Sequence, residues 1–362
     1  MKKVSLFDSA VFLFIRRHWL TVAFLLGFVT DYLLLNRVDD KVDSLVLFFY
    51  VILATVSLLL FYVGVAEKAP VRLVNLFNRF MPLLMQYSFG GLLSGMLIFY
   101  GRSGDLLVSA PFMILIVAII LLNELVKKRS DRLLYNLTVY FIGVISYLVL
   151  MVPVWIGEMG DLIFIGSGFL ALLVVFLVMK ILSFIIPHFL VLEKRMIIFA
   201  IGVFYVLFNT FYFFNIIPPI PLSLTELNIY QSVTKTTQNE YQLVREKKNW
   251  RDYLPFIKVF HPLPRQGAYC FASVYAPTSL TTNIVHRWEY LDNDGVWKEY
   301  FTKSYPIAGD NTTGYRGYTM IENLHDGKWR CSVETVRGQV LGRRTFKIDT
   351  SVSPDSLVTV VE

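Results

Sequence analysis

The chain has 362 residues, of which 55% are hydrophobic and only 17% are charged, and its formal net charge is +7. A mean hydropathy of +0.56 is too high for a soluble globular protein and is typical of a polytopic membrane protein. The basic residues of the apolar half lie in short connections between apolar runs and not on one face, which argues against a nucleic-acid partner.

Seven apolar runs are long enough to cross about 30 Å of hydrocarbon as helices. They occupy residues 19–35, 44–65, 80–100, 108–125, 134–156, 162–182 and 196–217. Thirteen Lys and Arg residues lie in alternate connections, whereas the other connections hold only Arg37, Lys41 and Arg102. Because positively charged connections stay in the cytoplasm, we expect a multi-pass protein of the bacterial inner membrane, surrounded by lipid, with a cytoplasmic amino terminus and a periplasmic carboxyl-terminal region.

Two features stand out inside the predicted spans. Asp31 is ionisable, and such a residue in a span is by default a functional-site hypothesis. Its place near the outer end suits a contact with headgroups or with a neighbouring helix at least as well. Gly91 and Gly95 have the small-xxx-small spacing that lets helices approach closely, which predicts helix packing or a dimer contact within the bundle.

A proline-rich stretch separates two kinds of sequence. Pro218, Pro219 and Pro221 remove backbone donors and disfavour helix before them, so the last span should end near Ile217. We therefore expect a helical domain at 1–217, a linker at 218–224, a β domain at 225–350 and a tail at 351–362.

The expected β domain shows short alternating runs separated by turn residues, which is typical of antiparallel strands. One hairpin should pair 284–290 with 296–302 around Asp294 and Gly295, and another should pair 329–336 with 341–348 around Arg337 and Gly338. Further strands are expected at 227–232, 241–244, 257–260 and 268–276. Seven or eight strands in this length suit a two-sheet, immunoglobulin-like sandwich.

Cys270 and Cys331 share strand faces with apolar residues, so both should point into the core. With Trp288 between them, the order Cys, Trp, Cys is similar to the pin of an immunoglobulin-like domain. A disulfide and a pair of buried free thiols both remain open on this evidence.

Residues 225–350 also carry a series of short motifs. These are AP-x-x-L, I-x-H-x-W, G-Y-R, G-x-W-R-x-x-V and L-G-x-x-x-F-x-I, carried by Ala276, Pro277, Leu280, Ile284, His286, Trp288, Gly314, Tyr315, Arg316, Gly327, Trp329, Arg330, Val333, Leu341, Gly342, Phe346 and Ile348. The region resembles a bacterial β-domain family of unassigned function, some members of which place this domain after a multi-span region. The resemblance implies an exported domain on a membrane anchor and supplies no catalytic residue.

The same motifs supply a candidate recognition surface, made of His286, Trp288, Tyr315, Arg316, Trp329 and Arg330. The aromatic residues would stack a sugar ring if they were exposed, but strand aromatics and a lone histidine on an apolar face are more often core. The two arginines would bind an anionic group, unless they pair with local acids such as Glu322 or Asp326.

No enzyme signature is present in the sequence: the five histidines form no metal-ligand spacing, and there is no nucleophile elbow or phosphate loop. We therefore expect no enzyme activity, no cofactor and no metal. The function expected is binding of a partner protein or envelope glycan by the exported domain, as an accessory part of a membrane complex. The alternative is a transporter, channel or lipid-handling protein that uses the bundle and Asp31.

Overall fold

A computed structural model describes residues 26, 29–35, 41–125, 133–237, 240–247, 258–263, 266–277, 280–308, 314–354 and 356–362. The chain forms two compact units. One is made of Met1–Tyr100 and Ala110–Phe214, and the other of Gly101–Ser109 and Asn215–Glu362.

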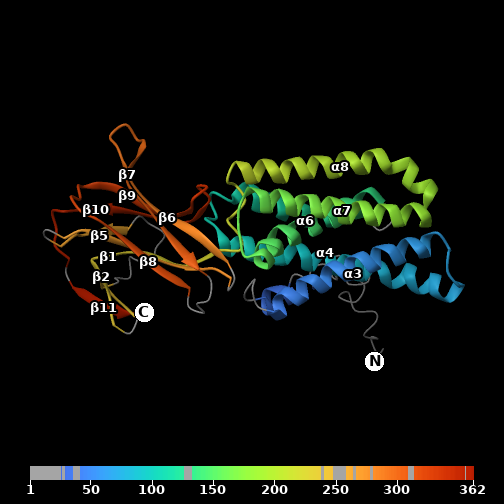
Figure 1. Ribbon diagram of the computed structural model, residues 1–362, viewed down its shortest axis with the longest axis horizontal. Coiled ribbons are helices and arrows are strands. Elements are labelled where there is room, and N and C mark those ends of the chain that lie inside the picture. Colours follow the sequence, from blue (N-terminus) through green and yellow to red (C-terminus); the bar gives the residue numbers. More distant parts are fainter. Residues whose placement is uncertain are drawn as a thin grey trace, which may run out of the picture. The chain divides into compact units, whose positions relative to one another are not determined.

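The first unit is helical, with elements labelled as in Figure 1. Its helices are α3 (Lys41–Val65), α4 (Val71–Ser103), α5 (Ala110–Leu125), α6 (Leu133–Ile156), α7 (Asp161–Ile185) and α8 (Pro187–Phe213). All of them except α5 are long and apolar enough to cross a membrane, which makes five. The predicted run 108–125 forms the shorter α5, and the run 19–35 lies mostly outside the described residues. Helix α8 begins nine residues before the predicted run at 196 and ends at Phe213, four residues before the expected Ile217.

Helix α6 is the centre of the bundle. It is buried over most of its length, as expected for a helix that is apolar on all sides. Two polar contacts join it to α3: the Tyr140 hydroxyl lies 2.7 Å from Thr55 Oγ1, and the Asn136 amide donates to the Tyr62 hydroxyl at 3.0 Å. Figure 1 shows α7 and α8 running beside it.

The two glycines of the predicted packing motif lie where α4 meets α3. A methyl group at Gly91 would lie 2.5 Å from Cε2 of Tyr50, and one at Gly95 would lie 2.7 Å from Cδ2 of Leu47. Because Gly91 leaves room for the Tyr50 ring, the Tyr50 hydroxyl can donate to the Asp31 carboxylate at 2.7 Å. Ser94 of α4 donates to the other oxygen of Asp31, which is fully buried. The structure therefore uses Asp31 as a contact between helices.

The second unit is rich in β structure. Its strands are β1 (Ser223–Tyr230), β2 (Ser232–Lys235), β3 (Tyr241–Glu246), β4 (Lys258–Phe260), β5 (Ala268–Tyr275), β6 (Thr281–Leu291), β7 (Trp297–Ala308), β8 (Tyr315–Ile321), β9 (Gly327–Thr335), β10 (Val340–Ile348) and β11 (Leu357–Val361). Both predicted hairpins are confirmed as β6–β7 and β9–β10. Their turns contain Gly295 and Gly338 with φ values of 74° and 87°, which glycine adopts without steric cost. The segment expected as a tail contains β11, which pairs with β3.

The strands form three sheets where two were expected. Their orders are β1-β5-β8, β4-β10-β9-β6-β7 and β11-β3-β2. One face of the β1-β5-β8 sheet supplies Cys270 and Ile321 to a core shared with the five-stranded sheet. Its other face supplies Tyr230 and Phe271 to a second core shared with the β11-β3-β2 sheet. The β1-β5-β8 sheet is therefore the middle layer of three.

The close approach of α3 to Gly91 predicts a steric effect of adding one methyl group there. We expect Gly91→Ala to lower the thermal unfolding midpoint of the full chain in detergent, because the buried Tyr50 ring must shift and its bond to Asp31 weakens.

Gly166 of α7 is the matched control, since no atom lies within 4 Å of a methyl group placed there. Gly166→Ala should leave the midpoint unchanged or raise it, because alanine favours helix over glycine by about 1 kcal/mol. Equal midpoints for the two variants would contradict the packing role of Gly91.

Candidate functional site

Three residues of the candidate recognition surface, His286, Trp288 and Trp329, lie in the core near a disulfide. Cys270 of β5 is bonded to Cys331 of β9, so the middle layer is joined covalently to the five-stranded sheet. Trp288 of β6 lies directly opposite Cys331 in the β-sheet register and packs in the same cluster as Trp329. Of the two states left open for the cysteines, the structure contains the disulfide.

His286 belongs to a buried chain of hydrogen bonds beside this disulfide. Its Nδ1 lies 3.1 Å from Thr319 Oγ1, which also accepts the indole N–H of Trp288 at 2.8 Å. Its Nε2 lies 2.8 Å from the Tyr305 hydroxyl. Burial lowers the pKa of His286 to about 4, so the ring is neutral near pH 7. The two sulfurs and a ring nitrogen lie within 4.8 Å of one another, but sulfurs joined in a disulfide lack the thiolate that binds a metal.

Of the two alternatives for His286, Trp288 and Trp329, the structure shows the core and not the aromatic platform, so their assignment to the candidate recognition surface is wrong. All three side chains are fully buried, because they fill the space between two sheets. The two indole N–H groups are satisfied inside the protein, one by Thr319 and the other by the carbonyl of His325 at 3.0 Å. No face of these rings is open to a ligand.

Arg330 is also engaged within the domain. Its guanidinium donates to both carboxylate oxygens of Glu289, at 2.5 and 2.8 Å, and lies 4.3 Å from the centre of the Trp297 ring. The partner is the residue directly opposite on the neighbouring strand β6, and not Glu322 or Asp326 as expected. A paired guanidinium of this kind holds two strands together and has few donors left for a ligand.

Tyr315 and Arg316 point to opposite faces of strand β8. Tyr315 stacks on Tyr305 of the five-stranded sheet, with ring centres 6.2 Å apart. Arg316 lies on the outer face of the middle layer, where Tyr318 and Met320 follow it at alternate positions. In the described part of the chain, the Arg316 guanidinium forms no ion pair or hydrogen bond.

The outer face of β8 is part of an exposed aromatic cluster, which we call the tyrosine face and define as Tyr241, Tyr269, Arg316, Tyr318 and Met320. Tyr318 is 41% exposed, and its ring centre lies 6.1 Å from that of Tyr269 and 6.2 Å from that of Tyr241. The Tyr241 hydroxyl donates to the Arg316 carbonyl at 3.4 Å. Tyr318 and Met320 are exposed, whereas Tyr269 is partly buried and Tyr241 is buried beneath them.

The sequence analysis predicted no strand between residues 302 and 329 and so missed this face. Residues 315–321 form a strand paired with β5. The exposed positions hold Tyr318 and Met320 and the buried ones hold Thr319 and Ile321, so polar and apolar residues do not alternate along this strand.

Two carboxyl groups lie on the same outer face, on β1 and at the end of β11. A hydrogen bond to Glu226, together with burial, raises the pKa of Glu362 to about 7. Burial opposes ionisation of Glu226, but hydrogen bonds from Glu362, Tyr230 and Asn228 outweigh it and hold the pKa of Glu226 below its ordinary value. The pair therefore carries between one and two negative charges near neutral pH, and Arg245 and Arg316 act electrostatically on Glu362.

The buried histidine predicts a pH dependence of stability. Because the pKa of His286 falls from 6.5 to about 4 on folding, the unfolded chain takes up a proton first as the pH is lowered. We expect the β domain to lose about 3 kcal/mol of stability between pH 6.5 and pH 4 from this group, at about 1.4 kcal/mol per pKa unit.

The measurement is unfolding of the full chain by denaturant, followed by tryptophan fluorescence across this pH range. His286→Gln should reduce the loss of unfolding free energy between pH 6.5 and pH 4. The control His325→Gln, at an exposed position of the same domain, should show the same loss as the unchanged chain. A His286→Gln variant with the same pH slope as the unchanged chain would rule out this origin.

Comparison with known proteins finds a family model that matches part of the β domain. The model of a family described as "Protein of unknown function (DUF2914)" matches residues 281–348. These residues span β6 to β10 and fall within the region 225–350 whose motifs carry the resemblance. No curated protein matches the chain. Among solved structures, the Pseudomonas fluorescens alkylpurine DNA glycosylase bound to DNA containing an abasic site analog is 12% identical, with 82% of this chain and 77% of that chain covered and a TM-score of 0.19. A TM-score this low carries no argument about fold or function.

Proposed function

We propose that the protein is a recognition component of the bacterial inner membrane, with an exported immunoglobulin-like domain that binds an envelope glycan. In this proposal the apolar helices cross the membrane with the amino terminus in the cytoplasm, and the β domain lies in the periplasm. Five helices of sufficient length and the biased distribution of Lys and Arg support it. A disulfide in the β domain is in keeping with an oxidising compartment.

The observation that carries recognition is the exposure of Tyr318 on a rigid sheet face next to Tyr269 and Arg316. Aromatic rings stack on the apolar faces of sugars, and their hydroxyl groups remain available for hydrogen bonds. The Arg316 guanidinium, which has no acidic partner within hydrogen-bond distance in the described residues, suits the carboxylate of an acidic sugar. A partner protein that presents acidic and apolar groups would use the same contacts.

Because the β domain is tethered to the membrane in this proposal, a binding site of low affinity is sufficient for recognition. A domain held at the membrane surface meets envelope polymers that are also confined there, so its effective concentration is high. The tyrosine face therefore does not need high intrinsic affinity to place a membrane complex against the envelope.

The proposal predicts that recognition depends on one exposed ring. Tyr318→Ala in the full chain should weaken binding to acidic envelope glycans by about tenfold or more, because stacking contacts of this kind contribute about 1–2 kcal/mol. Binding would be measured on immobilised acidic and neutral glycan fragments with the detergent-solubilised protein.

Phe301→Ala is the matched control, since Phe301 is 38% exposed but lies on β7, away from the tyrosine face. It should bind as the unchanged chain does. Equal loss from both variants, or none from Tyr318→Ala, would count against the tyrosine face.

The alternative function, lipid handling by the bundle, also has an observation in its favour. A groove of about 670 Å³ lies between α7 and α8. Its walls include apolar residues and two cations, namely Val175, Phe176, Met179, Lys180, Lys194 and Ile198. The combination suits an anionic lipid whose chains lie along the apolar wall.

Asp31 distinguishes the two functions. Under the recognition proposal Asp31→Asn should leave glycan binding unchanged and lower the stability of the bundle by about 1–3 kcal/mol, because two hydroxyl donors lose a charged acceptor. Thermal unfolding and glycan binding of the same preparation would be compared. A variant that is folded but has lost lipid movement in proteoliposomes would favour the alternative.

A further inference from the structure

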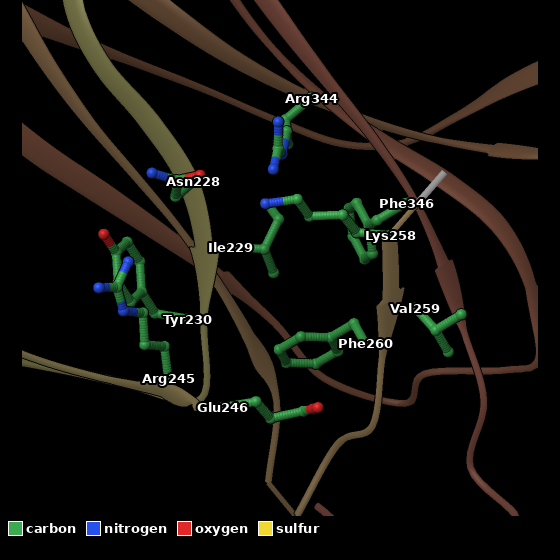
Figure 2. A pocket seen from close by; sticks show the side chains of 10 residues that line it. All are labelled: Asn228, Ile229, Tyr230, Arg245, Glu246, Lys258, Val259, Phe260, Arg344 and Phe346. Atoms are coloured by element: carbon green, nitrogen blue, oxygen red, sulfur yellow. The ribbon is translucent and has the colours of Figure 1, made fainter. Parts of the chain in front are cut away.

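A small cationic pocket lies at the β1 edge of the middle layer, opposite the edge formed by β8. It has a volume of about 100 Å³ and lies where β1, the end of β3, β4 and β10 meet. Figure 2 shows the side chains around it, including Ile229, Arg245, Lys258, Arg344 and Phe346. This pocket shares no residue with the tyrosine face.

Arg344 stands in an inward-facing row of strand β10. Alternation puts it on the same side of the strand as Phe346 and Ile348, both of which are buried in the core between the sheets. Its own side chain is half-buried, and burial lowers the pKa of its guanidinium. In the described part of the chain, Arg344 has no ion pair and no hydrogen bond from its side chain.

A half-buried guanidinium without a partner is costly, because it has lost water and gained no opposite charge. Other partly buried arginines in this domain do have a carboxylate partner. Arg330 is paired with Glu289, and Arg287 with Glu334 at 3.1 Å. The missing partner of Arg344 is therefore a feature of the pocket.

A second cation faces the same space. Lys258 lies at the start of β4, which pairs in parallel with β10, and Figure 2 shows its ammonium and the Arg344 guanidinium directed toward one region above Ile229. Arg245 of β3 also lines the pocket, but its guanidinium lies beside Tyr230 and acts electrostatically on Glu226 and Glu362.

The acid that lines the pocket is engaged by groups other than Arg344. Glu246 accepts the backbone N–H of His261 at 3.0 Å and the side-chain amide of Gln231 at 3.3 Å, and its other oxygen lies 3.1 Å from Nδ1 of His261. The pocket therefore has a half-buried arginine without a partner, a lysine beside it, and an acid that is engaged elsewhere.

We propose that this pocket binds a phosphoryl group, with Arg344 as its principal donor. The fork of a guanidinium matches two oxygens of a phosphate, and a lysine supplies a further point charge. The volume suits a single tetrahedral oxyanion, and a phosphate has oxygens for both the Arg344 fork and the neighbouring Lys258. The group is supplied either by free phosphate or by a phosphorylated lipid or sugar whose remainder stays outside.

The test is binding to the full chain in a maltoside detergent, which carries no phosphate. The probes are inorganic phosphate, glycerol 3-phosphate, glucose 1-phosphate and acetate, and the readouts are calorimetry and the thermal unfolding midpoint. Inorganic phosphate should bind and raise the midpoint, because a ligand that binds only the folded chain stabilises it. Tighter binding of either ester would identify an attached phosphoryl group as the source, and equal binding would identify free phosphate.

Arg344→Gln should weaken phosphate binding by about tenfold or more and remove the shift of the midpoint. Arg343→Gln is the matched control: the neighbouring residue carries the same charge but points to the other face, where its Nε donates to Ser332 Oγ at 3.1 Å. It should bind phosphate as the unchanged chain does.

A second variant separates a binding role from a structural one. Without phosphate, Arg344→Leu should unfold at the same temperature as the unchanged chain or higher, because an uncompensated charge is replaced by an apolar side chain. The proposal is overturned if phosphate fails to bind the unchanged chain, if acetate binds as tightly as phosphate, or if Arg344→Gln and Arg343→Gln bind equally well.

Discussion

The bond between Cys270 and Cys331 is the constraint on which the β domain depends. It closes a loop of 61 residues, which chain-entropy arguments value at about 4 kcal/mol. Its greater effect is on geometry. Cys270 lies on β5, the central strand of the middle layer, so fastening β5 to β9 also fixes β8 on one side and β1 on the other. The tyrosine face and the cationic pocket, at opposite edges of one sheet, both take their positions from this bond.

The polar groups beside the disulfide make that core specific. Thr319 accepts the indole N–H of Trp288, so its single hydroxyl hydrogen is available to Nδ1 of His286, which favours the tautomer with hydrogen on Nε2, facing Tyr305. Each side chain in this hydrogen-bond network thus needs the next one in place. Because the network joins β6, β7 and β8, a shift in strand register would break several buried hydrogen bonds at once.

Local patterns were sufficient to predict the long apolar helices among the described residues, the change to β structure at the prolines and both hairpins. Each of these follows from residues close together in sequence. Alternation did not show which face is buried, and for that reason the indole rings were considered as a binding surface. The pocket was beyond such reasoning, since Arg344 and Lys258 meet only through the parallel pairing of β10 with β4. The one sign of the pocket in the sequence is an arginine on the same side of the strand as the apolar residues Phe346 and Ile348.

Strand β7 forms one edge of the five-stranded sheet, and nearly all of its residues are exposed. A long open edge can recruit an identical edge from a second molecule and begin aggregation. Here Lys298, Glu299 and Lys303 place charges along the strand, and Pro306 offers no backbone donor. The other edge, β4, is only three residues long. Both edges of the described sheet therefore resist pairing with a second copy of the domain.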